Sequence, residues 1–249
     1  SFSYHRVMLD DMCWAIQLGR LSGKELPDST TDRCLQAARW LAEFVEPSTG
    51  RVPNYGANDG ANLLPLACSD YLDYRPIVDS VFAVCDEGQV TFGAGPWQEK
   101  ALWLTGRVPS QLGLLKRDVC WKAEQGGYYI LRGPNSFLFT RAAKFRDRPS
   151  QCDALHVDLW AGNINVLRDA GSFRYYHRDA EVKNYFYSAK AHNTVSVPTR
   201  DQMIKGSGYL GPDCQMLVLA LPSTADQSSF QGLLTEFHVL ELTLNEHAQ

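Results

Sequence analysis

Two histidines and an aspartate in the second half of the chain have the side-chain chemistry of a metal site. His156, Asp169 and His192 each lie on or beside a segment whose residue pattern predicts a β-strand. Imidazole nitrogens and a carboxylate oxygen are ordinary zinc ligands, and two histidines with one carboxylate make a three-ligand site. Because the spacing between them is long, only the fold can bring them together. From spacing alone, the alternative is that both histidines make local hydrogen bonds in the core or at the surface.

Groups that could handle protons and sugars occur in the first half. Tyr4 lies at a predicted helix start, and a tyrosine hydroxyl can donate or accept a proton where its surroundings shift its pKa. The loop 54–61 carries amides and a carboxylate, including Asn58 and Asp59, beside glycines that permit tight turns. Such groups suit sugar hydroxyls or a substrate carboxylate. The alternatives are an amphipathic tyrosine at a helix end and an ordinary surface loop.

An aromatic residue beside polar groups forms a third feature. Trp97 is followed two residues later by Glu99, and an aromatic face next to polar groups suits a sugar platform. The alternative is that Trp97 packs in the core with Trp103. Asp59 and Glu99 are also the two carboxylates that a glycoside hydrolase would need, although we rank that mechanism below the others.

Basic residues gather at 141–148 in a chain that is acidic overall. Arg146 and Arg148 lie in this cluster, and Gln151 follows it. Because arginine pairs well with carboxylates and sulfates, the cluster could receive anionic sugar units. The alternative is a solvated loop.

The segments that must position these residues change character near residue 118. Before it, apolar residues recur at spacings of three and four, which predicts helices over 5–20, from Thr31 or Asp32 to Val45, from Pro76 through Phe82, and over 97–104. After it, short runs separated by turn residues predict strands over 128–132, 137–141, 156–160, 164–167, 173–176, 194–197, 216–221 and 238–244. We therefore predict a multidomain α+β protein: helices over 1–110, a linker over 106–117, and antiparallel sheets over 118–249, with 210–249 left open.

Composition excludes several classes of function. With 28 acidic and 24 basic residues, the net charge of −4 argues against a general nucleic-acid binder. No apolar run reaches membrane-spanning length. The seven cysteines include no C-x-x-C pair, so neither a disulfide framework nor a zinc knuckle is predicted. Because the chain starts at Ser1 without a Met or a signal pattern, we interpret it as missing its natural N-terminus, and its cellular location is not predicted.

Taken in order, these segments resemble the heparinase II/III superfamily of polysaccharide lyases. The resemblance covers residues 1 to about 209 and rests on the order and spacing of short motifs at 3–6, 52–61, 73–76, 95–99, 148–153, 156–160, 169–173 and 191–195. It implies a portion of an (α/α) toroid followed by an antiparallel β-sandwich, with the active cleft between them.

The resemblance also implies a chemistry. Members of the superfamily cleave uronic-acid glycans, such as heparan sulfate or alginate, by β-elimination, and some are periplasmic. It implies that Tyr4 supplies the acid or base and that His156, Asp169 and His192 hold zinc. The implied partner is an acidic polysaccharide or oligosaccharide, with no nucleic acid and no membrane span. The implied substrate-binding residues are Asn58, Asp59, Arg75, Trp97, Glu99, Arg146, Arg148 and Gln151.

Departures from the superfamily pattern leave a second function open. The superfamily's Asn-His or Asn-Asn pair, which helps neutralise the substrate carboxylate, lies upstream of the tyrosine, and this chain starts too late to contain it. Some lyases carry a catalytic histidine two residues before the first metal-ligand histidine, where this chain has Ala154. After Tyr209 the pattern no longer continues. The alternative is a non-catalytic glycan-binding protein or a truncated, inactive member.

Three geometric expectations follow. His156, Asp169 and His192 should converge on one metal. The loop 54–61, Arg75 and Trp97 should line one groove with Tyr4. That tyrosine should face the β domain, within reach of a sugar ring that also contacts Asn58 and the arginines near residue 148.

Overall fold

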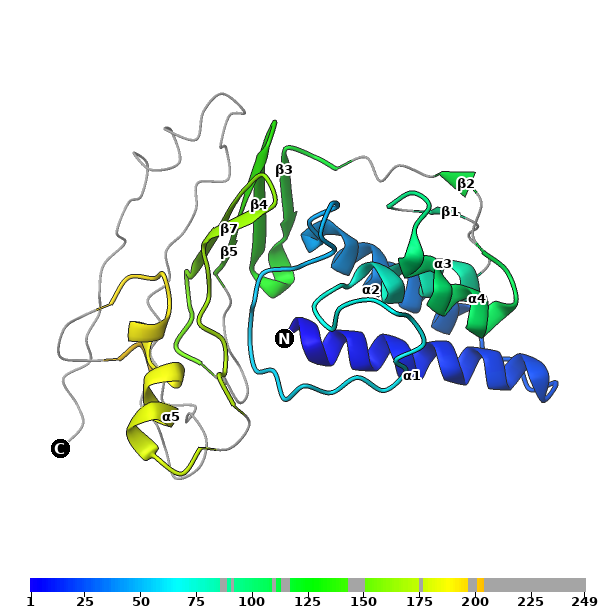
Figure 1. The fold of residues 1–249 in the computed structure, drawn as a ribbon, viewed down its shortest axis with the longest axis horizontal. Coiled ribbons are helices and arrows are strands. Elements are labelled where there is room, and N and C mark those ends of the chain that lie inside the picture. The colour runs from blue at the N-terminus through cyan, green and yellow to red at the C-terminus, as the bar shows by residue number, and fades with distance from the viewer. Residues whose placement is uncertain are drawn as a thin grey trace.

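The structure is a computed structural model that describes residues 1–85, 89–90, 92–108, 111–112, 117–142, 151–174, 177–196 and 201–203. Figure 1 shows a helical part beside a twisted sheet, with the N-terminus close to the sheet. The change from helices to strands predicted near residue 118 therefore coincides with the change from one layer to the other.

Four helices make up the first part: α1 (Phe2–Leu21), α2 (Asp28–Phe44), α3 (Arg75–Val84) and α4 (Glu99–Thr105), the last preceded by the 3₁₀ turn η1 (Pro96–Gln98). Ser1 caps α1, because its Oγ accepts the backbone N–H of Tyr4 at 3.3 Å. Pro76 lies in the first turn of α3, where its missing N–H leaves no bond unmade. The predicted helices are confirmed, with ends shifted by a few residues. None of the helices that the structure describes has the length and apolar character of a membrane span.

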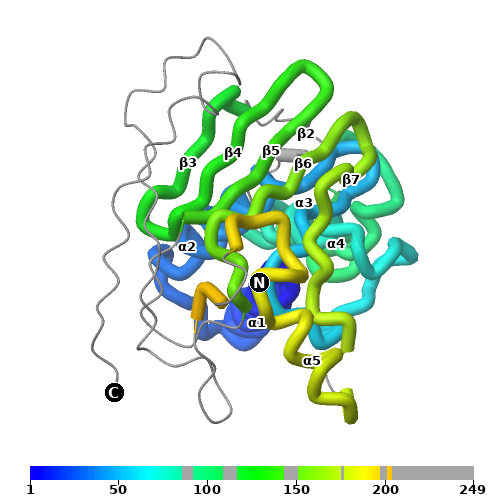
Figure 2. The backbone as a smooth tube through the Cα atoms, turned by 90° about the vertical axis from the view of Figure 1, so that its left-hand side faces the viewer, coloured from blue at the N-terminus to red at the C-terminus, as the bar shows by residue number. Residues whose placement is uncertain are grey.

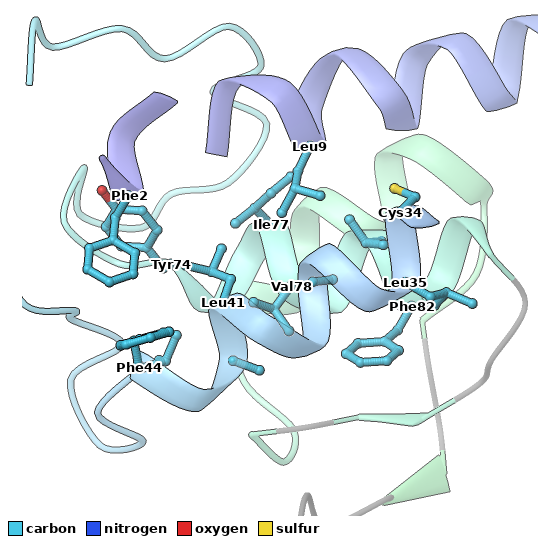
Figure 3. Packing of buried hydrophobic residues seen from close by; sticks show 14 of the residues in the cluster. Phe2, Leu9, Cys34, Leu35, Leu41, Phe44, Tyr74, Ile77, Val78 and Phe82 are labelled. Atoms are coloured by element: carbon cyan, nitrogen blue, oxygen red, sulfur yellow. The ribbon is translucent and has the colours of Figure 1, made fainter. Parts of the chain in front are cut away.

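The apolar faces of the first three helices form the core of the helical part. Leu9 on α1, Leu41 on α2 and Ile77, Val78 and Phe82 on α3 are all buried against one another (Figure 3). Each such side chain contributes roughly 1.5–3 kcal/mol relative to an exposed one. The spacing of three and four that predicted these helices therefore marks the faces that pack.

Five antiparallel strands follow in chain order: β3 (Cys120–Ala123), β4 (Tyr128–Gly133), β5 (Ser136–Arg141), β6 (Val157–Ala161) and β7 (Ile164–Leu167) (Figure 2). The strands predicted at 128–132 and 137–141 are confirmed, and they form a hairpin in which Gly133 pairs with Ser136 around the turn Pro134–Asn135. Shorter elements complete the described chain: the parallel pair β1 (Gln89–Val90) and β2 (Gln111–Leu112), the 3₁₀ turns η2 (Glu124–Gly126) and η3 (Ala189–Ala191), and helix α5 (Ala180–Tyr187).

Two predicted strands are wrong in the parts that the structure describes. Phe173 has a left-handed φ of 58°, which no extended strand contains, and Thr194 lies in a loop. The predicted strands at 216–221 and 238–244 lie outside the described residues. The β-sandwich and the toroid therefore stay predictions, while the combination of helices with one five-stranded antiparallel sheet is observed.

One aromatic cluster joins the helical part to the sheet. The ring centres of Phe2 and Phe44 lie 6.3 and 5.3 Å from that of Phe139 on β5. The ring of Tyr128 on β4 lies 5.0 Å from that of Trp40 on α2. Because alternate residues of a strand point to the same face, one face of the sheet packs against the helices. The two parts share a single hydrophobic core.

Gly50→Ala is expected to destabilise this fold far more than Gly60→Ala. Both glycines have left-handed φ angles, 74° and 80°, so each substitution costs about 1–2 kcal/mol for the backbone alone. At Gly50 an added Cβ would also lie 1.8 Å from Oδ1 of Asp73 and 2.6 Å from Nε of Arg75, whereas at Gly60 nothing lies within 4 Å. Breaking the buried ion pair between Asp73 and Arg75 costs about 3–5 kcal/mol more. Urea unfolding measures both variants, and equal losses would contradict the expectation.

Candidate functional site

His156, Asp169 and His192 come together at one end of the sheet. His156 directly precedes β6, Asp169 lies two residues after β7, and His192 follows η3. Oδ2 of Asp169 lies 3.0 Å from Nδ1 of His192 and 3.7 Å from Nε2 of His156. One nitrogen or oxygen from each residue lies within 4.8 Å of the other two, and all three residues are buried. The expectation that these side chains converge is confirmed.

The chemistry of this cluster fits a metal ion. Nε2 of His156 and Nε2 of His192 are both buried and have no hydrogen-bond partner. A buried polar atom without a partner is costly, and a cation would satisfy it. Burial alone would lower the pKa of His192, but its hydrogen bond to Asp169 and the nearby carboxylate charges raise it. A metal at this ring would therefore compete with a proton.

Backbone groups fix the orientation of the cluster. Oδ1 of Asp169 accepts the N–H of Gly171 at 2.6 Å. Nδ1 of His156 accepts the N–H of Asn193 at 3.0 Å. A metal bound through Nε2 of His156 would place the ring proton on Nδ1, so this contact with Asn193 would have to open.

The loop after α2 attaches the helical part directly to the cluster of His156, Asp169 and His192, the candidate metal site. Nδ2 of Asn54 donates to the backbone oxygen of Asp169 at 3.3 Å. The N–H of Asn58 donates to Oγ of Ser172 at 3.2 Å. A Cβ on Gly171 would lie 2.4 Å from Nδ2 of Asn54, so only glycine permits this approach. The loop 54–58 and the segment 169–172 therefore hold each other in place.

The hydroxyl of Tyr4 donates to Oδ2 of Asp59 at 2.7 Å, and both side chains are exposed. This hydrogen bond and the N–H of Ala61 hold the pKa of Asp59 below its usual value. The loop is fixed further by Tyr71, whose hydroxyl donates to Oδ1 of Asn58 at 2.7 Å. The structure thus brings Tyr4, Asn58 and Asp59 together, and a carboxylate accepts the hydrogen bond of the tyrosine hydroxyl.

Arg75 and Trp97 contact each other, but inside the fold. The guanidinium carbon of Arg75 lies 3.8 Å from the ring centre of Trp97. Its Nε and Nη2 donate to Asp73 at 3.0 and 2.8 Å, and Nη1 donates to the carbonyls of Pro47 and Ser48. With these donors engaged and only 8% of the residue exposed, Arg75 holds the turn after α2. That this pair lines one groove with Tyr4 stays a prediction.

The remaining candidates occupy separate places. Oε2 of Glu99 accepts the N–H of Cys68 at 2.8 Å, so it fixes a loop beside α4. Gln151 is buried, and its Nε2 donates to the carbonyl of Gly171 at 3.4 Å while its Oε1 has no partner. Arg146 and Arg148 lie outside the described residues.

Asp153 is a buried acidic residue close to both the candidate metal site and Arg141. Burial raises the pKa of Asp153, while the charges of Arg141 and His192 oppose the shift. The guanidinium of Arg141 lies 4.8 and 5.0 Å from the ring centres of Tyr55 and Tyr128. Arg141, which belongs to the predicted basic cluster, therefore contacts aromatic residues of the protein itself.

A cavity of about 300 Å³ opens between the loop after α2 and the β6–β7 hairpin. Its lining includes Asn54 and Asn58 from the predicted set, but also Arg51 and Arg168, which the sequence did not single out. The position of Arg168 immediately before the metal-cluster residue Asp169 is the one sequence signal that could have drawn attention to it.

Residues 117–218 match a family model described as the heparinase II/III-like C-terminal domain. This region of the chain is a heparinase II/III-like domain. The resemblance found in the sequence is thereby confirmed for the part that contains the sheet and the candidate metal site. No curated protein matches the chain.

Solved structures extend the likeness of the heparinase-like domain into the helical part. The heparan sulfate lyase HepC from Pedobacter heparinus matches with a TM-score of 0.56 and 18% identity over 81% of this chain. A heparinase III structure matches with a TM-score of 0.55 and 20% identity over 80% of it. At this identity the likeness concerns the fold. The chain spans 29% and 31% of the length of these two structures.

Proposed function

We propose that this protein is of the polysaccharide lyase type and cleaves uronic-acid glycans by β-elimination. The heparinase II/III-like domain and the fold shared with a heparan sulfate lyase support this class of activity. The observation that carries the proposal is the exposed hydroxyl of Tyr4, fixed by Asp59 at 2.7 Å beside the loop that contacts the metal cluster.

β-Elimination needs two proton transfers and one neutralised charge. A base removes the proton at C5 of the uronate, the bond between C4 and O4 breaks as a C4–C5 double bond forms, and an acid protonates O4. The hydroxyl of Tyr4 donates to Oδ2 of Asp59, so its proton is held in a fixed position. We therefore assign Tyr4 the role of the acid that protonates O4. Positive or amide groups must hold the substrate carboxylate during the reaction.

An absorbance assay tests this function directly. The unsaturated uronate formed by elimination absorbs in the near ultraviolet, whereas a hydrolysis product does not. We expect the full-length protein to raise this absorbance with at least one member of a panel of uronate glycans, and to leave neutral glycans intact. New reducing ends without ultraviolet absorbance would indicate hydrolysis and contradict the proposal.

A specific observation favours glycan binding without catalysis as the second candidate. Ala154 stands where some lyases carry a catalytic histidine, and its methyl group can neither give nor take a proton. Its backbone N–H donates to Oε1 of Gln202 at 3.0 Å, and Nε2 of Gln202 returns a bond to its carbonyl at 3.1 Å. Binding of a uronate glycan with no product after prolonged incubation would favour this candidate.

We propose that His156, Asp169 and His192 hold a structural zinc ion. When bound, zinc would crosslink the ends of β6 and β7 to the segment after η3. The base and the acid of elimination lie elsewhere, so these three side chains position the fold rather than move protons. The two buried Nε2 atoms without partners support the assignment.

Removal of the metal is expected to lower the melting temperature by about 5–10 °C. A ligand at a hundred times its dissociation constant contributes about 2.7 kcal/mol, and each kcal/mol corresponds to about 2–4 °C in a chain of this size. Elemental analysis should find one zinc per chain, and a chelator or His192→Ala should remove it. His177→Ala, which changes a histidine outside the cluster, should keep both the metal and the melting temperature. Purified protein that binds no zinc would contradict the assignment.

A further inference from the structure

The cavity at the edge of the sheet has walls from both parts of the protein. Thr49, Arg51 and Asn54 contribute from the loop after α2, and Asn163, Asn165 and Arg168 contribute from the β6–β7 hairpin and the residue after it. Its volume of about 300 Å³ is at the lower end of the range for small-molecule pockets. That is room for a single sugar unit rather than for a whole oligosaccharide.

The charge of the lining differs from that of the chain. The lining contains two arginines and four asparagines, and no aspartate or glutamate is among the described residues that form it. The whole chain, in contrast, has 28 acidic and 24 basic residues. The cavity is therefore a locally cationic site that offers amide groups beside two guanidinium groups.

Both arginines are available to an anion. The side chain of Arg168 makes no ion pair or hydrogen bond with any residue that the structure describes, since only its backbone oxygen is bonded, to Asn193. Nη2 of Arg51 lies 3.8 Å from Oδ2 of Asp70, and the two side chains are 49% and 63% exposed. A long pair in solvent holds its partners weakly. A carboxylate or sulfate in the cavity would therefore replace only this weak pair between Arg51 and Asp70.

Aromatic residues also line the cavity. Phe2, Tyr55 and Trp160 line it and are buried. The indole N–H of Trp160 donates to Oδ1 of Asp158 at 2.6 Å, so its polar atom is already satisfied within the sheet. Aromatic and polar side chains in one lining match a sugar ring, which has apolar C–H groups together with hydroxyls.

We propose that this cavity binds one acidic sugar unit, with Arg51 and Arg168 pairing its carboxylate or sulfate. The inference rests on the proposed function and adds a binding site at the β6–β7 edge. Planar guanidinium groups pair both kinds of anion with two parallel hydrogen bonds. Neither arginine belongs to the residues that the sequence pattern implied for substrate binding.

Calorimetric titration tests the site in a Tyr4→Phe background, so that cleavage does not consume the ligand. The ligands are a tetrasaccharide with uronate and no sulfate, a sulfated uronate tetrasaccharide, and a neutral tetrasaccharide. Arg51→Gln/Arg168→Gln should weaken binding of the acidic ligands at least tenfold, the effect of losing charge-assisted hydrogen bonds. Arg174→Gln/Arg178→Gln makes the same change of charge at exposed arginines outside the cavity and should leave affinity unchanged.

The results separate this inference from the proposed function. Equal losses in the two double variants would show a general effect of charge and overturn the site, as would equal affinity for the neutral ligand or no binding at all. If both acidic ligands bind, the arginines pair with the carboxylate. If only the sulfated ligand binds, they pair with the sulfate. If the wild-type protein forms no unsaturated product but the cavity variants lose affinity, the site stands and the catalytic proposal fails.

Discussion

Tyr4→Phe is expected to lower the turnover of a uronate glycan by about a hundredfold or more, the usual scale for an acid–base group. The substitution keeps the ring and removes only the hydroxyl that bonds to Asp59. Because 47% of Tyr4 is exposed, loss of that bond should cost no more than about 1 kcal/mol of stability. The rate of ultraviolet absorbance measures turnover in a full-length, active form, and the melting temperature reports the fold.

A second tyrosine provides the matched control. Tyr185 on α5 is also 47% exposed and lies outside the proposed site. Tyr185→Phe should therefore leave turnover unchanged. Near-normal turnover in Tyr4→Phe would show that its hydroxyl does not carry the proton, and it would shift the assignment toward glycan binding without catalysis.

The second large effect is expected where α4 meets α1. Nζ of Lys100 pairs with Oδ1 of Asp10, and the two side chains are only 4% and 0% exposed. Asp10→Leu would leave the lysine charge buried without its partner, at a cost of about 3–5 kcal/mol. That is a large part of the 5–15 kcal/mol that holds a typical domain together. Urea unfolding at neutral pH measures the loss.

The opposite variant should show a distinct dependence on pH. Burial raises the pKa of Asp10, and the charge of Lys100 opposes that shift. In Lys100→Met the folded protein would therefore hold the Asp10 proton at a pH where the unfolded chain, with a pKa of about 3.9, has released it. The contribution of Asp10 to stability should be largest below about pH 4 and should fall as pH rises through the folded pKa.

The double variant distinguishes pairing from mere burial. Asp10→Leu/Lys100→Met removes both charges and fills their place with apolar groups, so its stability at neutral pH should approach that of the wild-type protein. Its unfolding should also lose the pH dependence of Lys100→Met. A double variant as unstable as either single variant would show that shape, and not charge, controls this contact.

Periodicity predicted the elements whose own side chains form the core. The apolar residues of α2 at Leu35, Ala38 and Leu41 are buried as their spacing requires. Helix α5 has no fully buried residue, so it has no apolar stripe to detect. Its one local signal is Asp179, whose side chain caps the helix by accepting the N–H of Glu181. Strand β3 is short, and none of its residues is fully buried, which weakens the pattern in the same way.

The site was predictable only where residue type determines the chemistry. Imidazole and carboxylate groups are ordinary zinc ligands, so the convergence of these three side chains could be expected from the resemblance. The burial of Arg75 could not be expected from the sequence, because it depends on Trp97 and on the carbonyls of the turn after α2. Apart from its position next to Asp169, Arg168 has no sequence pattern that marks it, because its cavity is built by segments that are distant in sequence.

The aromatic core shared by the helices and the sheet restricts how these two parts can move relative to each other. Opening the two parts as a hinge would separate Phe2, Phe44 and Trp40 from Tyr128 and Phe139. Exposing such side chains costs roughly 1.5–3 kcal/mol each, so the sum rivals the stability of a whole domain. The shared core therefore opposes a hinge motion between the helices and the sheet, and under the proposed function a glycan would contact the surface loops at this boundary.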